Sequence, residues 1–481
     1  MTRPTAPNEF PDMSFVAPAP VDARILDALT NAGVDVDITA RERAEHSRDW
    51  WPRLIGATSR GEVERWPSAV VRPVSSAQVS DVLRLASQFH VAVTAQGGRS
   101  GVVGGAVPEA GAIALDLTGL NHIVDVDEIS STVRVEAGVF GPDLEAALRP
   151  RDLTVGHFPQ SFDFATVGGW IACRGAGQYS NRYGKIEDIV RALTVVLANG
   201  DIVELGGRAP RQAVGPDLVQ LFVGSEGTLG VITEATLVLR RRPSYEARRA
   251  FGFATFAQGL DACRRIVQRG SNPAVLRLYD GVESKRNFDV DACVLVVLDI
   301  GERPYVDATL NVIFDECTTA SSLGDTLVEH WLERRNDVGA LAPLWERGLV
   351  VDTIEVSGNW RVLDNLTERV GAALRARAGM LIVSVHQSHA YVDGACLYFT
   401  FAGQPDGDVD AFYRGAWDAA MDEVIALKAA ISHHHGVGRN RARHVARALG
   451  SSYPLLEGIK AVLDPEGTLN PGVLGLGGEP W

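Results

Sequence analysis

The segment QGGRSGVVGGAVP, residues 96–108, directly follows the apolar run VAVTA and decides the fold. Its glycines permit tight backbone turns and allow the chain to approach a ligand closely. Successive backbone N–H groups in such a loop form a nest that suits a pyrophosphate. The segment matches neither GxGxxG at the start of a helix nor GxxxxGK[ST], so it predicts neither a Rossmann fingerprint nor a P-loop. Taken alone, it is equally well explained as a glycine-rich turn between strands.

Three further segments follow this loop in order: PQSFDFATVGGW (159–170), RYGKIEDIV (182–190) and FVGSEGTLGVIT (222–233). In the last of them, Gly227 and Gly230 would let the chain pass edge-on against a flat ring system. Each segment is moderate evidence by itself. The ordered set is strong evidence for a nucleotide-type cofactor that carries a flat ring.

Composition excludes several classes of protein. A chain of 481 residues with 46% apolar residues has room for two or three globular domains. No apolar run reaches the roughly 20 residues that span a bilayer, which excludes an integral membrane protein. The formal net charge of −14 argues against a nucleic-acid partner. The five cysteines are scattered and never spaced CxxC, which predicts a reducing compartment and neither a disulfide framework nor a zinc site.

The chain divides into four stretches. Residues 1–65 are expected to form a tail and helices, and residues 66–245 an α+β domain in which the segment 75–90 is a helix with Ser76 as its N-cap. The Asn199–Gly200 pair predicts a hairpin turn. Residues 246–430 form a second α+β unit with two β–helix–β passages, which indicates a ferredoxin-like arrangement. Residues 431–481 run from SHHHGVGRNR to DPEGTLNPG.

The ordered glycine segments and the DPEGTLNPG tail resemble the vanillyl-alcohol oxidase superfamily, whose FAD-binding domain is of the PCMH type. The resemblance implies an α+β fold with a two-subdomain FAD-binding domain and a ferredoxin-like cap domain for the substrate. Covalent members place a histidine beside the first glycine loop, where this chain has Arg99 and Ser100, so non-covalent FAD is expected. The residues implied to contact FAD are Gly97, Gly98, Arg99, Ser100, Gly101, Val102, Pro159, Ser161, Thr166, Gly169, Arg174, Ala176, Glu226, Gly227, Gly230 and Ile232.

Candidate chemistry lies in the second half of the chain. The segment SHHHGVG places His433, His434 and His435 in a row before a glycine turn. On a strand such residues alternate faces, so at most two could reach one metal. A core histidine is the alternative, but next to a flavin an acid–base or substrate-orienting role is favoured. The apolar strand GACLYFTF (394–401) carries Tyr398 in the same way.

Arg277 interrupts the apolar run VLRLYD (275–280), where a buried cation requires a partner. It could form a structural ion pair, lower the pKa of an acid–base tyrosine, or anchor an anionic substrate.

Together with FDFATVGGW, these three motifs resemble the alkylglycerone-phosphate synthase (alkyl-dihydroxyacetonephosphate synthase) family. The resemblance implies that Tyr398 is the acid–base residue, that Arg277 lies beside it and that the histidine triplet borders the substrate. In that family an acyl ester is exchanged for a fatty alcohol without net redox change.

The second hypothesis is a flavin dehydrogenase or oxidase that takes a hydride from an alcohol or a 2-hydroxy acid. Related D-2-hydroxyacid dehydrogenases hold a divalent metal with GHxGDGNxH and a Glu-His pair. This chain has HAYVDGACLYF and His434–His435 there, so no metal is expected. A catalytically inert binding module is disfavoured, because the glycine loops and three candidate acid–base motifs are intact.

Two features depart from the synthase pattern. Family synthases hold the substrate phosphate with an arginine at the position of Leu341; Arg334, Arg335 or Arg347 could substitute. The run RNRARHVARA (439–448) is interpreted as a solvated helix face, or alternatively as a basic lip that attracts anionic substrate or lipid headgroups. We expect a small, lipid-like or anionic substrate, a homodimer, at most weak contact with a membrane surface, and a cytoplasmic, bacterial protein that lacks a secretory signal.

Overall fold

The first lobe of the protein contains two small sheets. The computed structural model describes residues 14–20, 22–207, 209–478 and 481; the first 13 residues of the expected tail lie outside this range. One sheet has the order β1-β2-β4-β3, with β2, β4 and β3 parallel and β1 antiparallel to β2. These strands are β1 (Asp35–Asp37), β2 (Ala69–Arg72), β3 (Val93–Gln96) and β4 (Ile113–Asp116). Helices α1 (Ala23–Asn31) and α4 (Ser76–Phe89) share its apolar core.

The second sheet of this lobe is antiparallel throughout, in the order β5-β6-β10-β8-β9. Its strands are β5 (Ile123–Asp127), β6 (Thr132–Glu136), β8 (Val190–Val196), β9 (Ile202–Gly206) and β10 (Val231–Val238). The β8–β9 hairpin turns at Asn199–Gly200 as predicted, and Gly200 has a φ of 88° that favours glycine. Helices α5 (Gly141–Leu148), α6 (Val167–Ala172) and α9 (Leu218–Phe222) contribute to its core.

Two local expectations for this lobe were wrong. Residues 35–37 form a strand within the stretch expected to be helical, because they complete the edge of the first sheet beside β2. The N-cap of α4 is Ser75, not Ser76: the Ser75 side chain accepts a hydrogen bond from the Gln78 N–H. Ser76 is instead the first helical residue, and its hydroxyl donates to Thr233.

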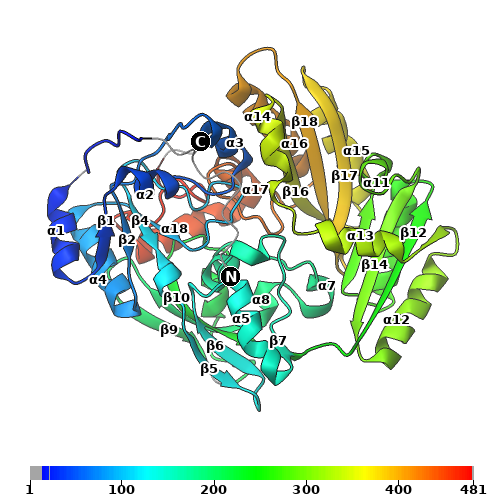
Figure 1. The fold of residues 1–481 in the computed structure, drawn as a ribbon, viewed down its shortest axis with the longest axis horizontal. Helices are drawn as coiled ribbons and strands as arrows, with labels where there is room; N and C mark the ends of the chain where they lie inside the picture. The colour runs from blue at the N-terminus through cyan, green and yellow to red at the C-terminus, as the bar shows by residue number, and fades with distance from the viewer. Residues whose placement is uncertain (1–13, 21, 208, 479–480) are drawn as a thin grey trace.

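The second lobe is built on one seven-stranded antiparallel sheet with the order β15-β12-β14-β13-β17-β18-β16 (Figure 1). The strands are β12 (Tyr245–Phe253), β13 (Val275–Tyr279), β14 (Cys293–Gly301), β15 (Ser321–Gly324), β16 (Val350–Asn359), β17 (Met380–Ala390) and β18 (Gly394–Gly403). Strands β12 to β15 have the sheet order β15-β12-β14-β13 of a ferredoxin-like β–α–β–β–α–β unit, with one additional helix, α11 (Gly281–Phe288), between β13 and β14, which confirms that prediction. Strands β16 to β18 form a second such unit without a fourth strand.

The two faces of this sheet differ in character because side chains alternate along each strand. On β18, Leu397, Phe399 and Phe401 are buried in a core shared with α10 (Phe256–Gln268), α12 (Arg303–Glu316), α15 (Leu363–Arg375) and α16 (Val409–Ala426). Tyr398 and Thr400 therefore point to the opposite face. The register places His386 of β17 and Glu355 of β16 directly beside Tyr398 on that face.

The C-terminal segment returns to the first lobe, where the red end of the chain in Figure 1 lies among blue and cyan elements. Helix α18 (Tyr453–Leu463) leads to Leu469, which forms a bridge with Val93 of β3. The lobes also meet through Trp51, whose indole N–H donates to the Tyr413 hydroxyl at 2.9 Å.

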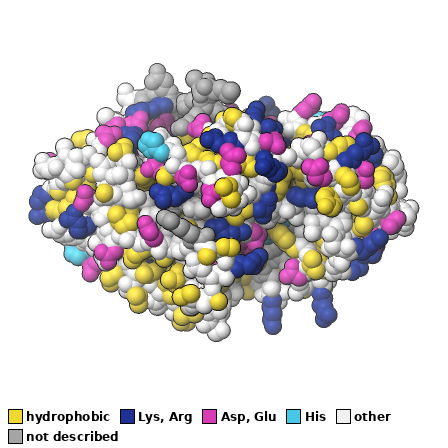
Figure 2. Space-filling model, turned by 90° about the horizontal axis from the view of Figure 1, so that it is seen from below, with side chains coloured by type: hydrophobic (Ala, Val, Ile, Leu, Met, Phe, Trp, Pro, Cys, Tyr) yellow, Lys and Arg dark blue, Asp and Glu magenta, His cyan; other side chains and the backbone are white. Residues whose placement is uncertain are grey.

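Basic and acidic side chains are interspersed on the face shown in Figure 2. Within the described residues, no helix combines the length and apolarity needed to cross a membrane.

The glycine loop after β3 packs tightly against the segment before α6. A Cβ atom at Gly98 would lie 1.8 Å from the Phe164 carbonyl oxygen, which belongs to the backbone and cannot rotate away. We expect Gly98→Ala to destabilise the protein by more than about 1 kcal/mol, the lower end of the usual cost of overpacking. Thermal unfolding measures this. Gly407→Ala is the matched control, since a Cβ there meets nothing within 4 Å; equal melting temperatures for the two variants would contradict the prediction.

Candidate active site

A cavity of about 730 Å³ is lined by residues of both lobes. The first lobe contributes the glycine loop 97–102, the segment from Pro159 to Ala176 and the Glu226–Ile232 stretch. The second lobe contributes the polar face of its sheet, including Arg277 and Tyr398. The cavity therefore brings together segments that are far apart in the sequence.

Among the residues expected to contact FAD, Arg174 is the one that does not line this cavity. Its guanidinium instead pairs with Glu187 at 2.7 Å and donates to Gln220 at 3.1 Å. Of the candidate catalytic residues, Arg277, Tyr398, His434 and His435 line the cavity. His433 lies behind them: its Nε2 is 2.8 Å from the Tyr391 hydroxyl, and its Nδ1 is 2.8 Å from His434 Nδ1.

The glycine loop has the features of an anion-binding nest. Among the described residues, no hydrogen bond is donated by the backbone N–H groups of residues 98–102, which line the cavity. Arg99 holds a φ of 50° in the left-handed region, and its side chain contacts His46. Unpaired backbone donors in such a conformation suit a pyrophosphate. The donor set of the loop therefore fits FAD.

Several buried polar atoms along the cavity have no hydrogen-bond partner within the described part of the chain. They are both ring nitrogens of His157, the indole N–H of Trp170, the hydroxyl of Ser388, Nε of Arg277 and Nδ1 of His435. Buried polar groups are rarely left unsatisfied, so a polar ligand is the natural partner for them. His157 lies two residues before the 159–170 motif, and no pattern in the sequence singled it out. Burial lowers its pKa to about 3, so its ring is neutral.

Tyr398 and His435 form the closest acid–base pair in the cavity. The phenol oxygen lies 2.5 Å from His435 Nε2. Burial lowers the pKa of His435 to about 4 and raises that of Tyr398 above its ordinary value. Near neutral pH the phenol is therefore protonated and donates to the neutral imidazole. This geometry allows a proton to move from Tyr398 to His435.

Arg277 lies on the same face of the sheet as Tyr398, but no hydrogen bond joins the two side chains. Its Nη2 is 2.6 Å from Nε2 of His386, and the His386 ring stacks on the Tyr398 ring with a centroid distance of 4.8 Å and an angle of 11°. Within the described residues Arg277 forms no ion pair, which removes the structural ion-pair alternative. His386 was not singled out in the sequence, because an isolated histidine in a strand carries no motif.

The histidine loop is fixed by Glu355, a fully buried carboxylate on β16. Glu355 accepts hydrogen bonds from the Ser432 hydroxyl at 2.8 Å and from the backbone N–H groups of His433 and His435 at 2.5 and 3.0 Å. Arg441 completes the set at 2.9 Å. Burial opposes the charge of Glu355, but the charge of Arg441 and the hydrogen bonds from Ser432 and His433 together outweigh burial and hold the pKa below its ordinary value.

The interpretation of 439–448 as a solvated helix face or a basic lip was wrong for its first arginines. Arg441 is fully buried against Glu355, and Arg439 is buried with its guanidinium on the Val107 and Pro471 carbonyls. Arg443 pairs with Asp418, and only Arg447 among the four is largely exposed. The sequence pattern could not show this, because the carboxylate partner of Arg441 comes from a distant strand.

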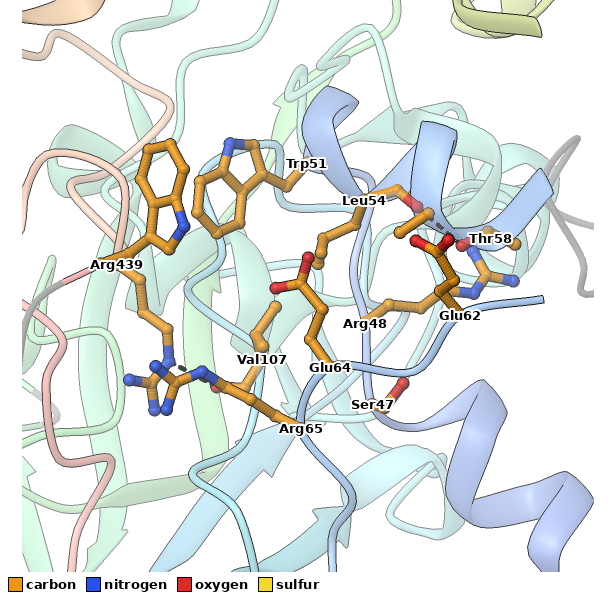
Figure 3. Close-up of a pocket in the computed structure, with 12 residues that line it drawn as sticks. Ser47, Arg48, Trp51, Leu54, Thr58, Glu62, Glu64, Arg65, Val107 and Arg439 are labelled. Carbon is orange, nitrogen blue, oxygen red and sulfur yellow. Dashed lines mark hydrogen bonds between the residues drawn. The ribbon is translucent and has the colours of Figure 1, made fainter. Parts of the chain in front are cut away.

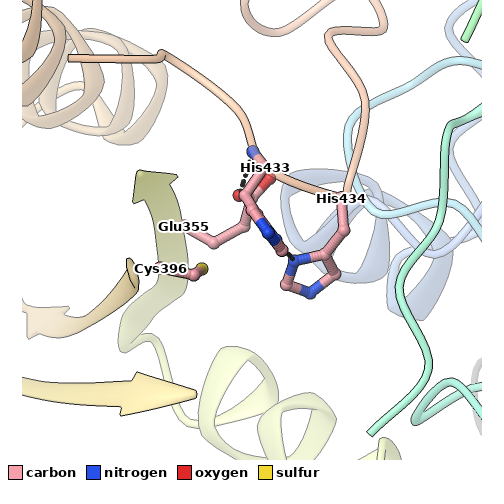
Figure 4. Close-up of side chains that lie close together, drawn as sticks. All are labelled: Glu355, Cys396, His433 and His434. Carbon is pink, nitrogen blue, oxygen red and sulfur yellow. Dashed lines mark hydrogen bonds between the residues drawn. The ribbon is translucent and has the colours of Figure 1, made fainter. Parts of the chain in front are cut away.

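A cluster of Glu355, Cys396, His433 and His434 lies at the wall of the cavity, with their nearest potential ligand atoms within 4.8 Å of one another (Figure 4). Hydrogen bonding accounts for this cluster. The Glu355 oxygens accept several donors, and the two histidines share a contact between their Nδ1 atoms. Burial raises the pKa of Cys396, which disfavours the thiolate that a metal would need.

A second hollow, beside Trp51 and Arg439, has a volume of about 20 Å³ (Figure 3). This is room for about one water molecule. It is too small for an organic substrate.

The arginines considered as replacements at the Leu341 position do not line the large cavity. Leu341 itself does, whereas Arg334, Arg335 and Arg347 do not. Arg335 is instead paired with Gln178, 3.1 Å from its side-chain oxygen. Arg286, on α11 (Gly281–Phe288), lines the cavity and was not considered from the sequence.

Comparison with known proteins agrees with this site. Residues 67–206 match the family described as FAD binding domain, and residues 242–474 match the C-terminal domain of FAD linked oxidases. The FAD-linked oxidoreductase YgcU of Escherichia coli (strain K12) is 31% identical over 85% of this chain and 89% of its own. An alkyldihydroxyacetonephosphate synthase of Dictyostelium discoideum is 29% identical over 85% of this chain and 74% of its own. A D-lactate dehydrogenase of Anaerostipes hadrus is 26% identical over 84% of this chain and 89% of its own.

Solved structures extend the comparison to the whole fold. A structure of an alkyldihydroxyacetonephosphate synthase matches with a TM-score of 0.81 and 25% identity, over 97% of this chain and 90% of that chain. p-Cresol methylhydroxylase matches with a TM-score of 0.75 and 16% identity, over 95% and 97%, which shows a shared fold. These findings confirm the expected fold class and FAD as the cofactor. The chain belongs to the family of FAD-linked oxidoreductases that join an FAD binding domain to an FAD linked oxidase C-terminal domain, and it is an FAD-dependent enzyme.

Proposed function

We propose that this enzyme uses Tyr398 as an acid–base group beside FAD, on an alcohol- or ketone-type substrate with a lipid-like part, in the manner of an alkyldihydroxyacetonephosphate synthase. The contact between Tyr398 and His435 at 2.5 Å, in a cavity shared with the glycine loop, carries this proposal. In it, residues 66–245 hold FAD, residues 246–430 hold the substrate, and residues 431–481 return to complete the site.

FAD, when bound, supplies an electrophilic ring that exchanges electrons with a substrate carbon. The glycine loop would hold its pyrophosphate, and the Glu226–Ile232 stretch would lie along the cofactor. His157 and the Trp170 indole are buried polar groups positioned to meet it or the substrate.

The proton follows a short path through this chain. Burial raises the pKa of Tyr398 and lowers that of His435, so no free phenolate forms beforehand. As the phenol oxygen takes a proton from the substrate carbon or hydroxyl, its own proton moves to His435 Nε2, 2.5 Å away. Glu355 Oε1 lies 4.0 Å from His435 Nδ1, so its negative charge stabilises the imidazolium that forms. Arg277, which lines the same cavity, offsets the negative charge that develops on the phenol oxygen during this transfer.

The second-lobe side of the cavity supports a substrate with an apolar chain. Seven aliphatic side chains line it there beside the polar ones: Val338, Leu341, Leu344, Leu349, Val351, Ile382 and Ala402. Apolar area of this kind binds hydrocarbon by removing it from water. Arg286 lines the same cavity, with its guanidinium 3.5 Å from Glu283, and would meet an anionic group of the substrate.

Hydride transfer from an alcohol or a 2-hydroxy acid to the flavin is the second candidate function. It is favoured by the match of residues 242–474 to FAD linked oxidases and by the similarity to a D-lactate dehydrogenase. Tyr398 or His435 would then remove the hydroxyl proton. The two functions differ in whether the flavin is left reduced.

Anaerobic spectroscopy separates these functions. We expect the holoenzyme, mixed with palmitoyl-dihydroxyacetone phosphate and hexadecanol, to release palmitate and form the ether product while the visible flavin absorbance recovers fully. D-Lactate is the matched probe for the second function. Stoichiometric bleaching of the flavin by D-lactate, with release of an oxidised product, would replace the synthase proposal with hydride transfer.

Removal of the Tyr398 hydroxyl tests the acid–base assignment. We expect Tyr398→Phe to retain FAD and to lower kcat by about 100-fold to 10,000-fold, the usual contribution of a general acid–base group. Tyr391→Phe is the matched control, because that hydroxyl contacts His433 outside the cavity lining. It should lose less than about tenfold. Full activity of Tyr398→Phe would exclude the assigned role.

The low pKa values of the cavity histidines predict that neither His435 nor His157 titrates near neutrality. Burial lowers the pKa of His435 to about 4 and that of His157 to about 3, so both are neutral above about pH 5. The acceptor role of His435 is present above its pKa and is lost as the pH falls through about 4. Glu226 is a cavity residue that titrates near neutrality, because burial raises its pKa to about 7. We therefore expect any limb of kcat/KM between about pH 6.5 and about pH 7 to disappear in Glu226→Gln, and a limb there that persists in this variant would contradict the assignment of His435.

A further inference from the structure

A chain of polar contacts lies beneath Tyr398, on the side of the sheet that faces the cavity. Glu283 of α11 is buried and its Oε2 lies 2.8 Å from His386 Nδ1. His386 Nε2 lies in turn 2.6 Å from Arg277 Nη2. The chain of contacts therefore runs from a helix through β17 to β13 and ends at a guanidinium that lines the cavity.

The chemistry of the two ends fixes the protonation of the histidine. A guanidinium has only donors, so His386 Nε2 must be unprotonated to accept from Arg277. An ionised carboxylate has only acceptors, so His386 Nδ1 must carry the proton that it donates to Glu283. A single neutral tautomer satisfies both contacts. Burial also lowers the pKa of His386, in agreement with a neutral ring.

Glu283 is itself held firmly. Its other oxygen, Oε1, accepts hydrogen bonds from the Ser384 hydroxyl at 3.0 Å and the Thr400 hydroxyl at 3.1 Å. Asp280, the N-cap of α11, accepts from the Glu283 N–H and from the Val385 N–H of β17, which ties the helix to the sheet. The carboxylate therefore has little freedom to turn away from His386.

We propose that Glu283 and His386 are positioning residues that hold Arg277 in the cavity beside Tyr398. The inference depends on the proposed function in one respect: the reaction must use Arg277. His386 also stacks on the Tyr398 ring, so one imidazole orders both residues. The Arg277 Nε atom is buried without a partner within the described residues, which leaves a donor for a ligand.

The tautomer of His386 in the holoenzyme is the first test, and it needs no substrate. The protein is labelled with 15N-histidine, and long-range 1H–15N spectra are recorded between about pH 6 and about pH 8. The His386 signal is assigned by its loss in His386→Gln. We expect a protonated Nδ1 and a bare Nε2 throughout. A protonated Nε2, in either the other tautomer or the imidazolium, would overturn the proposal.

Two variants of His386 separate positioning from a merely structural role. His386→Gln keeps an acceptor oxygen near the place of Nε2 for Arg277, whereas His386→Asn keeps only a partner for Glu283. We expect the asparagine variant to lower kcat by about tenfold to 100-fold, as for the loss of a charged hydrogen bond, with KM within about threefold. The glutamine variant should recover most of that activity. Both variants should retain FAD.

Equal losses in the two variants, or a larger loss in the glutamine variant, would show that packing alone matters and would overturn the proposal. The assay is whichever of the two reactions above the wild-type enzyme performs. Failure of both reactions would exclude the proposed function and leave the tautomer result to decide the role of His386. A wrong tautomer in an enzyme that performs the synthase reaction would overturn only the present inference.

Discussion

The buried ion pair between Glu355 and Arg441 is the interaction on which the site depends. Both side chains are fully buried, and removing two charges from water costs more than their attraction alone returns. Three further donors, from Ser432, His433 and His435, satisfy the same carboxylate. The pair therefore does more than connect two residues: it determines the path of the histidine loop across the sheet and so places His435 against Tyr398.

The alternation of side chains along the strands explains why one sheet can be both a core and an active-site wall. Leu397 and Phe399 on β18 are buried with the helices, while Tyr398 between them faces the cavity. The neighbouring strands supply Glu355 and His386 at the same level. Hydrogen bonds across strands order the polar side chains of this face, and its apolar residues on β13 and β14 are buried in a separate core.

The first lobe was more predictable than the second. The glycine loop, the TVGGW segment and the EGTLG segment are each continuous in sequence, and all the residues expected to contact FAD except Arg174 line the cavity. Some of their glycines are required by local packing, such as Gly98, where a Cβ atom would meet the Phe164 carbonyl oxygen. A requirement that is local along the chain leaves a pattern in the sequence.

The sequence by itself predicted an FAD cofactor from its glycine-rich segments and a ferredoxin-like arrangement in the second half, and it singled out Tyr398 and the histidine triplet. Only the tertiary structure decided which histidine meets the tyrosine, and that Arg277 is held by His386 and Glu283. It also showed that Arg441 is buried with Glu355 instead of solvated. The physical reason is that hydrogen bonds and ion pairs between distant strands depend on register and on loop path, which residue spacing along one chain does not record.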